Sequence, residues 1–399
     1  MTQNENNNST APALYLDNAT TSFPKAPGII EEIKRVMTHV YASPNRSSYA
    51  TARESNKLVD NIRTQVAIFA GCQKPEKVLF PSGATYALNL AMKGLLKKGD
   101  HVITTGYDHN AVLRSLRSLR RQGIKTSIVK CPLTDHTLVA AITKEFRPQT
   151  SLIVLPWTSN VTGAMMPVKE IGNYARKNGI TVLVDASQSV GCIPVEADTL
   201  PIDMIAFGAH KGMLGPFGVG CLIVNNPDII LEPLIEGGTG FDTLNTTSPL
   251  VFPESYEVGT QNLPGLAALG KSIDYISTPA YRGILERVNC VWTEFVQELS
   301  NLPFLEFYGR FADIAYLPIA SFNMNGFTPD QLADILDRHF LIQARAGLHC
   351  APCAHEMFHT LPSGALRISA GPSFTKEQGR RLRTALEEIF ERRDEYARS

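Results

Sequence analysis

The chain lacks both long apolar runs and an excess of charge of one sign. Its longest apolar stretches, such as Leu152–Trp157 and Ile202–Phe207, are far too short to cross a bilayer as a helix. Lysine plus arginine number 38 and aspartate plus glutamate also number 38, so no net positive charge attracts nucleic acid or an anionic membrane surface. By elimination, we expect a globular protein that acts on a small molecule, without membrane or nucleic-acid partners.

Cysteine is scarce as well. The chain has 7 cysteines in 399 residues, an odd number spread thinly, which argues against a disulfide scaffold. Residues 1–13 are polar and rich in asparagine, with neither the basic start nor the apolar core of a signal peptide. We therefore expect a disordered tail over 1–13 and a cytoplasmic protein.

The pattern of apolar residues predicts two domains. From about Val78 to Asn225, short apolar runs alternate with longer amphipathic ones, which predicts an α/β fold with a mostly parallel sheet covered on both faces. The run Cys221–Asn225 follows a Gly/Pro-rich turn, and we expect it to form a strand antiparallel to its neighbour. Beyond about Asn262, amphipathic helices separated by short apolar runs predict a smaller α+β domain.

Several polar residues end apolar runs of the predicted sheet. They are Asp108 and His109, Asn160, Asp185, and His210 with Lys211. In parallel sheets, ligands bind beyond the carboxyl ends of the strands, where helix N-termini also point. We therefore expect these side chains to converge on one site.

Lys211 and Asp185 suggest a specific cofactor. A lysine that closes an apolar run is either a surface residue or an amine held in a pocket for Schiff-base chemistry. Asp185 is either a helix N-cap or the partner of a buried cation, such as a protonated pyridine nitrogen. Such a nitrogen makes a pyridoxal ring an electron sink, so the pair favours pyridoxal 5'-phosphate.

A turn that contains Ser82 and Gly83 follows a predicted strand and precedes a helix that we expect to begin near Ala84 or Thr85. The free amides of that first helical turn suit a phosphate group. No G-x-x-x-x-G-K-[ST] motif occurs, so the turn is not a nucleotide-binding P-loop.

With these pieces in order, the chain from Tyr15 to about Glu387 resembles the class V aminotransferase fold group, and within it the cysteine desulfurases and selenocysteine lyases. The resemblance implies a type I pyridoxal-phosphate-dependent transferase fold with a large domain, built on a seven-stranded-type sheet, over 27–262. A small α+β domain would comprise 14–26 and 263–399. The matching segments are YLDNATTSFPK, FPSGATYALN, DHNAV, TSNVTG, LVDASQSVG, FGAHKGMLGPFGVG, YEVGTQN, RAGLHCAP and LRIS.

The resemblance also implies roles for the residues that hold the ring. Lys211 is similar to the Schiff-base lysine, and Asp185 to the partner of the pyridine nitrogen. Gln188 would donate to the phenolic oxygen, and His109 would stack on the ring face.

Further positions resemble those that hold the phosphate and the substrate. Ala84, Thr85 and His210 would cradle the phosphate, and Thr260 would reach the phosphate of the neighbouring subunit in a homodimer. Asn160 and Arg367 resemble residues that hold the substrate carboxylate. A guanidinium suits this group because it can donate two parallel hydrogen bonds to the two carboxylate oxygens.

Cys350 stands where these desulfurases place their nucleophile. The implied reaction removes sulfur from L-cysteine, leaving L-alanine and a persulfide on Cys350, and we expect Arg345 and His349 to favour its thiolate. A sulfur-acceptor protein is a further possible partner. Alternatives are a selenocysteine lyase, and an aminotransferase or β-eliminating C–S lyase acting on a modified cysteine, for which Cys350 would be dispensable. A non-catalytic scaffold has no need of Lys211, Asp185 and His109.

Two positions depart from the family pattern. Gly208 replaces a serine that often stands two residues before the histidine of the His-Lys pair, which removes one hydroxyl from the phosphate site. Tyr49, in Arg46-Ser-Ser-Tyr49, stands where relatives often have histidine, and it is expected to face the pocket.

Cys350 and Cys353 form a C-x-x-C pair, which suits a redox pair or half of a metal site. The segment from His355 to His359 formally matches the zinc-binding pattern H-E-x-x-H. We expect a chance match and no metal, because Thr360–Gly364 contains a proline and a glycine that would break the required helix.

Overall fold

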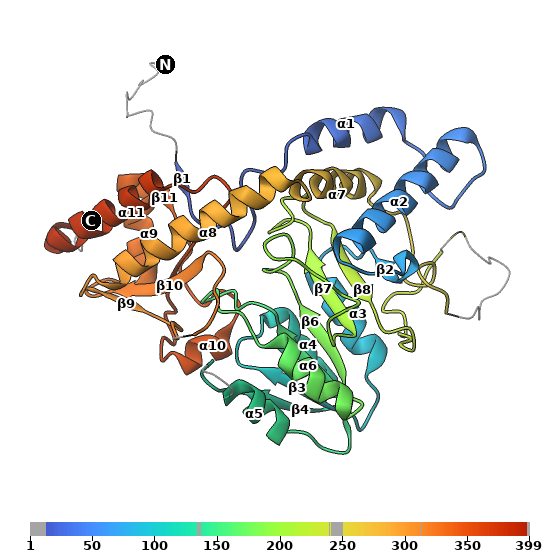
Figure 1. Ribbon diagram of the computed structural model, residues 1–399, viewed down its shortest axis with the longest axis horizontal. Helices are drawn as coiled ribbons and strands as arrows, with labels where there is room; N and C mark the ends of the chain where they lie inside the picture. The colour runs from blue at the N-terminus through green and yellow to red at the C-terminus, as the bar shows by residue number, and fades with distance from the viewer. Residues whose placement is uncertain (1–12, 134–136, 239, 241–249, 312, 397–399) are drawn as a thin grey trace, which may run out of the picture.

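The computed structural model describes residues 13–133, 137–238, 240, 250–311 and 313–396. Within these ranges the chain forms a large seven-stranded sheet and a small three-stranded sheet, both flanked by helices, and a two-stranded sheet of β1 and β11 (Figure 1). The strands are β1 (Leu14–Tyr15), β2 (Val78–Leu79), β3 (His101–Thr105), β4 (Lys125–Val129), β5 (Thr150–Pro156), β6 (Thr181–Asp185), β7 (Met204–Gly208), β8 (Gly220–Val224), β9 (Leu305–Phe307), β10 (Ile319–Met324), β11 (Ile342–Gln343) and β12 (Leu366–Ser369). The helices are α1 (Ile29–His39), α2 (Ala50–Phe69), α3 (Ala84–Leu95), α4 (Asn110–Arg120), α5 (Thr137–Lys144), α6 (Val168–Lys177), α7 (Leu263–Ile276), α8 (Pro279–Ser300), α9 (Pro329–Phe340), α10 (Pro352–Met357), α11 (Lys376–Glu391) and α12 (Arg393–Tyr396), with a 3-10 turn at Pro75–Lys77.

The large sheet has the strand order β2-β8-β7-β6-β5-β3-β4 among the described residues. The strands from β7 to β4 pair in parallel, whereas β8 runs antiparallel to β7 and β2 antiparallel to β8. The expected mostly parallel sheet and the returning antiparallel strand are therefore confirmed. This topology directs the carboxyl ends of β3, β5, β6 and β7 to one edge of the sheet.

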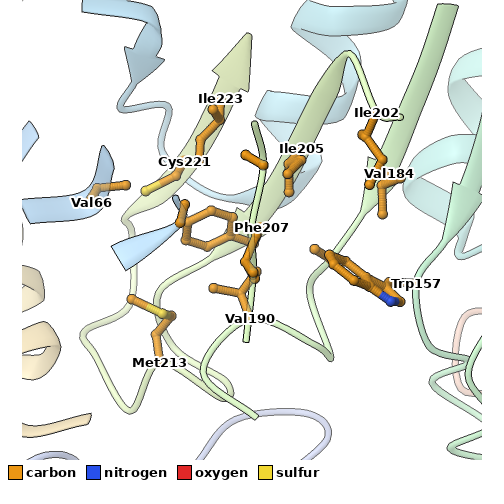
Figure 2. Packing of buried hydrophobic residues seen from close by; sticks show 14 of the residues in the cluster. Val66, Trp157, Val184, Val190, Ile202, Ile205, Phe207, Met213, Cys221 and Ile223 are labelled. Carbon is orange, nitrogen blue, oxygen red and sulfur yellow. The ribbon is translucent and has the colours of Figure 1, made fainter. Parts of the chain in front are cut away.

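Alternate residues of each strand pack on opposite faces of the large sheet. On β7, Ile205 and Phe207 pack with Val66 of α2 and with Met213, as Figure 2 shows. The intervening residues of the same strand pack toward α3 and α4 on the other face. Because both faces are covered, the strand is buried along its whole length, and burying a side chain such as that of Phe207 stabilises the fold by about 1.5–3 kcal/mol.

The small sheet has the order β12-β10-β9 within the described ranges, and it packs against α8, α9 and α11. Thr328 and Thr375 each begin a helix with a reciprocal capping box, which fixes where α9 and α11 start. The helices predicted beyond Asn262 are present as α7, α8, α9 and α11. None of the helices in the described part of the chain combines the length and apolar character that a membrane crossing requires.

The N-terminal segment joins the two parts of the molecule. Strand β1 pairs in parallel with β11, and Ala19 donates its backbone N–H to the hydroxyl of Ser369. Helix α7 packs against α1 and α2 and shares the core of the large sheet. We therefore propose that the large domain extends through α7, to residue 276, rather than ending at 262. The tail expected over 1–13 lies, except for residue 13, outside the described residues.

Candidate active site

A cavity of about 630 Å³ lies beyond the carboxyl ends of β6 and β7. It brings together residues that are far apart in the sequence. Of the residues singled out in the sequence, those that line it are Ser82, Gly83, Ala84, Thr85, His109, Asn160, Asp185, Gln188, Gly208, His210, Lys211, Arg345, His349 and Arg367. Asp108 and Cys350 are not part of this lining. The convergence expected from the strand ends is thus present except for Asp108.

Lys211 lies just beyond β7, in a turn closed by a hydrogen bond from the N–H of Leu214 to the Lys211 carbonyl. Burial lowers the pKa of the Lys211 amine to about 8, although the nearby Asp185 carboxylate opposes this shift. A larger fraction of the amine is therefore neutral near pH 7 than for an exposed lysine. A neutral amine is the form that attacks a carbonyl group.

Asp185 is the last residue of β6, and its carboxylate is buried in the wall of the cavity. Its Oδ1 accepts a hydrogen bond from the N–H of Ser187 at 3.0 Å, so it caps the following turn. The same carboxylate also faces the cavity. Gln188 donates its side-chain amide to the carbonyl of Ala19 at 2.9 Å, which links the large sheet to the N-terminal segment.

His109 is the N-cap of α4. Its Nδ1 accepts a hydrogen bond from the N–H of Ala111 at 3.0 Å, and burial lowers the pKa of the ring. The neutral ring therefore carries its hydrogen on Nε2 and presents an uncharged face. The preceding Asp108 is fully buried, and its Oδ2 accepts hydrogen bonds from both Thr104 and Thr105, which fixes the backbone beside His109.

The first turn of α3 forms the end of the cavity that suits a phosphate. The helix begins at Ala84 after Gly83, and no side chain caps it. Gly220 of β8 allows this turn to approach closely, since a Cβ there would lie 2.5 Å from the carbonyl carbon of Gly83. The uncapped amides are therefore available to an anion.

His210 and Gly208 lie beside this helix end. The Nδ1 of His210 is buried without a hydrogen-bond partner, and burial lowers the pKa of the ring to about 4. A Cβ at Gly208 would lie 3.2 Å from Cδ2 of His210 and 3.8 Å from the N of Ala84. The family's serine would thus reach the place between the His210 ring and the first amide of α3. These free amides, and a histidine with an unpartnered nitrogen that lines the same cavity, fit the phosphate of pyridoxal phosphate.

Arginine side chains form the opposite wall. Arg367 is 1% exposed, and its Nη2 lies 2.7 Å from Oδ1 of Asp17 and 2.9 Å from Oγ1 of Thr20. Its Nη1 donates to the backbone carbonyl of Asn160 at 3.0 Å, whereas its buried Nε has no partner. Arg345 also donates to Thr20, at 2.9 Å, so the two guanidinium groups share one hydroxyl.

Cys350 lies on the loop that follows Arg345. Nη2 of Arg345 is 3.9 Å from the Cys350 sulfur, and the N–H of Asn110 donates to the Cys350 carbonyl at 2.7 Å. Arg345 and His349 line the cavity, and the charge of Cys350 is close enough to raise the pKa of Lys211. Cys350 itself is only partly buried, and it lies next to this lining without belonging to it.

Two of the sequence-derived positions lie elsewhere. Thr260 is exposed and does not belong to the described lining of the cavity in its own chain. Tyr49 is 55% exposed, and Arg46 in the same segment donates to the carbonyl of Gly238 at 2.8 Å. Neither position is part of the cavity that a single chain forms.

The H-E-x-x-H segment does not form a zinc site. Helix α10 has 6 residues and ends at Met357, so the expected helix break is confirmed. Both ring nitrogens of His355 already face other side chains, Nε2 toward His349 and Nδ1 toward Thr360. The described part of the chain holds no group of three or more potential metal-ligating side chains.

Sequence reasoning did not single out Asp17, Thr20 or His355 as parts of the site. Asp17 and Thr20 lie in the N-terminal matching segment, and their contacts with Arg367 depend on the chain returning to that place 350 and 347 positions later. Only the presence of an acidic residue in an otherwise apolar and small segment hinted at the first of them.

Comparison with known proteins agrees with this architecture. The model of the aminotransferase class-V family matches residues 14–382. This chain belongs to that family. A protein of Methanothermobacter thermautotrophicus named "Probable cysteine desulfurase" is 31% identical over 382 residues, which cover 94% of each chain.

Two further relatives are also named cysteine desulfurases. The cysteine desulfurase of an Enterobacter species is 28% identical over 95% of this chain and 93% of its own length. The apo structure of a cysteine desulfurase from Thermococcus onnurineus superimposes with a TM-score of 0.86 at 27% identity, covering 94% of both chains. The family and its named members support the interpretation of this chain as an enzyme of the cysteine desulfurase type.

Proposed function

We propose that this chain is a pyridoxal-phosphate-dependent cysteine desulfurase. L-Cysteine and the Cys350 thiol would yield L-alanine and a persulfide on Cys350. The step balances because the substrate C–S bond breaks as the S–S bond forms, the proton of the Cys350 thiol is matched by the one that the substrate carbon gains, and reduction of that carbon offsets oxidation of the sulfur. The observation that carries the proposal is the position of the Cys350 sulfur, 3.9 Å from the guanidinium of Arg345, which lines the same cavity as Lys211 and Asp185.

The residues present fit pyridoxal phosphate. Lys211 would hold it covalently, Asp185 would face the ring nitrogen and Gln188 the phenolic oxygen, and His109 would cover the ring with its neutral face. Ala84, Thr85 and His210 would hold the phosphate, where His210 has an unpartnered buried nitrogen. The bound cofactor would supply an electron sink that weakens the bonds of the substrate amino acid.

The other wall of the cavity would position the substrate and accept its sulfur. We propose that Arg367 and Asn160 hold the substrate carboxylate, since the buried Nε of Arg367 lacks an acceptor and a guanidinium matches a carboxylate. The Cys350 thiolate, which is the attacking form, would lie beside the Arg345 guanidinium. The neutral form of His109 suits it to hold or pass a proton near the ring.

A homodimer would complete the site. Thr260 is exposed outside its own cavity, as expected of a residue that reaches a neighbouring subunit's phosphate. Large apolar side chains are also exposed: Phe217 of the cavity lining at 64%, Tyr41 at 74% and Tyr49 at 55%. We propose that these surfaces pair in the dimer, that the enzyme acts in the cytoplasm, and that a sulfur-acceptor protein removes the persulfide.

Parallel incubation with L-cysteine and L-selenocysteine tests the reaction. The purified protein should be yellow, release one alanine for each sulfur that reaches a reductant, and form no pyruvate. Pyruvate with ammonia would instead identify β-elimination, and a keto acid would identify amino-group transfer. Turnover of selenocysteine alone would identify a selenocysteine lyase. A colourless protein that takes up no pyridoxal phosphate would overturn the proposal.

A further inference from the structure

A chain of hydrogen bonds through two buried histidines lies behind Cys350. Nε2 of His349 lies 3.1 Å from the carbonyl oxygen of Arg345, and its Nδ1 lies 3.2 Å from Nε2 of His355. Nδ1 of His355 in turn lies 2.8 Å from Oγ1 of Thr360. The two histidines are 2% and 1% exposed, so water does not replace these partners. Neither His355 nor Thr360 has a role in the reaction proposed above.

The direction of these hydrogen bonds follows from their two ends. The Arg345 carbonyl can only accept, so Nε2 of His349 carries a hydrogen. Burial, with the nearby charge of Arg367, lowers the pKa of His349 to about 2, and burial lowers that of His355 to about 4, so both rings are neutral. Nδ1 of His349 therefore accepts from Nε2 of His355, which leaves Nδ1 of His355 as an acceptor. The Thr360 hydroxyl, which can also donate to the carbonyl of His355 at 3.2 Å, is the donor within reach of this nitrogen at 2.8 Å.

This row of hydrogen bonds leads to a stretch of backbone, at His349 and Cys350, that has an unfavourable conformation. His349 and Cys350 have φ values of 48° and 56°, two consecutive non-glycine residues in the left-handed region. Such residues persist only when their surroundings fix them. The carbonyl of His349 accepts from the side-chain amide of Asn160 at 2.7 Å, and the carbonyl of Cys350 accepts from the N–H of Asn110.

The hydrogen bonds through the two histidines connect the Arg345–Cys350 loop to Thr360. The ring of His349 reaches back to the carbonyl of Arg345, whose guanidinium lies beside the Cys350 sulfur. The turn after Thr360 also packs on the loop, because a Cβ at Gly364 would lie 2.1 Å from the carbonyl oxygen of Gly347. The loop is thus fixed from Thr360 as well as from the sheet.

We propose that His355 and Thr360 are positioning residues, which hold His349 and the Arg345 carbonyl so that the Cys350 sulfur stays beside the Arg345 guanidinium. This inference rests on the proposed function, because it assigns the two residues to the sulfur-accepting step. Loss of the Thr360 hydroxyl leaves a buried ring nitrogen without its donor, and the loop relaxes away from the left-handed conformation. The thiol then loses its charged neighbour and reacts more slowly.

The rate at which iodoacetamide alkylates Cys350 tests this arrangement directly, since the thiolate is the reacting form. All variants carry Cys353→Ser, so the tryptic peptide that follows Arg345 contains one thiol. Thr360→Val removes the hydroxyl, and Thr360→Ser retains it. The matched control is Thr150→Val, which removes a threonine hydroxyl that also pairs with a buried histidine. Oγ1 of Thr150 lies 2.8 Å from Nδ1 of His101, and this pair is at the edge of the large sheet opposite to the cavity.

We expect Thr360→Val to slow alkylation of Cys350 by about tenfold at pH 7, with turnover of cysteine reduced to match and its KM unchanged. Thr360→Ser and Thr150→Val should alkylate Cys350 at the rate of the parent. Equal alkylation rates in Thr360→Val and the parent would overturn the proposal, and so would a Thr360→Ser protein as slow as Thr360→Val.

If Thr360→Val does not fold, substitutions of His355 decide the question. His355→Gln keeps an N–H that can donate to His349, whereas His355→Leu removes it. Slow alkylation in the leucine variant with recovery in the glutamine variant supports the proposal, and equal rates in both overturn it. Alkylation requires no turnover, so a parent that produces no alanine refutes the proposed function and leaves this test intact.

Discussion

The two walls of the cavity are built in different ways. One wall consists of side chains at or just beyond the ends of strands of the large sheet, including Asp185 of β6 and Lys211 in the turn after β7. The other wall contains the loop of Cys350, where two consecutive residues adopt left-handed conformations. Buried strands fix the first wall, whereas a few hydrogen bonds fix the second.

The two walls would therefore serve different parts of the chemistry, binding of the cofactor and the fate of the sulfur. Strand ends hold the groups that suit pyridoxal phosphate, and a sheet tolerates little displacement of them. The loop holds the residue that would decide what happens to the sulfur. Changes to the sheet wall should therefore abolish every reaction, and changes to the loop wall should alter which reaction occurs.

The largest effect is expected from Lys211→Ala. The substitution removes the only amine at the end of β7 that lies in the described cavity wall, so the protein should lose its yellow colour, and alanine production should fall by at least about 10⁴-fold. Absorbance spectra and alanine assays measure both effects. Lys25→Ala is a control that changes a nearby lysine outside the cavity lining. Retained turnover in Lys211→Ala would show that the sheet wall does not carry the general chemistry.

Cys350→Ala should leave the cofactor bound but reduce alanine production from L-cysteine by about 10³-fold, because the sulfur then has no thiolate to accept it. Turnover of selenocysteine should fall much less, since selenium leaves more readily. Alanine, sulfide and selenide assays give the ratio of the turnover of cysteine to that of selenocysteine. Equal losses with both substrates would contradict the division between the two walls.

The pH dependence of cofactor uptake tests whether burial lowers the pKa of the Lys211 amine. Its pKa is lowered to about 8, so the neutral, reactive amine increases as pH rises through 8 and is nearly complete above it. Uptake of pyridoxal phosphate by the apoprotein should accelerate by about tenfold between pH 7 and pH 9 and then level off. A rate that still climbs steeply from pH 9 to pH 10.5 would indicate an amine with ordinary solvation. Stopped-flow absorbance follows the reaction.

The smallest effect is expected from Gly208→Ser. A hydroxyl at this position would lie close to the N-terminal amides of α3 and to His210, and should add one hydrogen bond to the phosphate. Affinity for pyridoxal phosphate should increase by about three- to tenfold, with turnover nearly unchanged. Titration of the apoprotein measures the affinity, and Gly208→Ala controls for the added bulk. Weaker binding of the serine variant would mean that its Cβ displaces the His210 ring.

The sequence predicts the sheet wall better than the loop wall, and the reason is physical. Asp185, His109 and Lys211 each close an apolar run, and the parallel arrangement of strands brings such ends together whatever the details of packing. The helices after Asn262 were likewise predictable, because their apolar residues repeat with the helical period.

The contacts of the loop wall depend on folding that no local pattern encodes. The pairing of His349 with His355 requires the turn into α10, and that of Arg367 with Asp17 requires the two ends of the chain to meet. The packing of α7 on α1 and α2 is of the same kind, since an amphipathic helix does not specify its partner. Roles at Cys350 and Arg367 therefore came from resemblance to a family, while their geometry came from the structure.

The meeting of the chain ends also sets the order of events during synthesis. Asp17 emerges from the ribosome early, but its partner Arg367 is translated 350 residues later. At about 5–20 residues per second, the N-terminal segment waits on the order of tens of seconds before its place in the cavity wall exists. Nascent chains can thus form the sheet first, but a complete pocket arises only after Arg367 has been made. Capture of the cofactor would then be a late step of biogenesis.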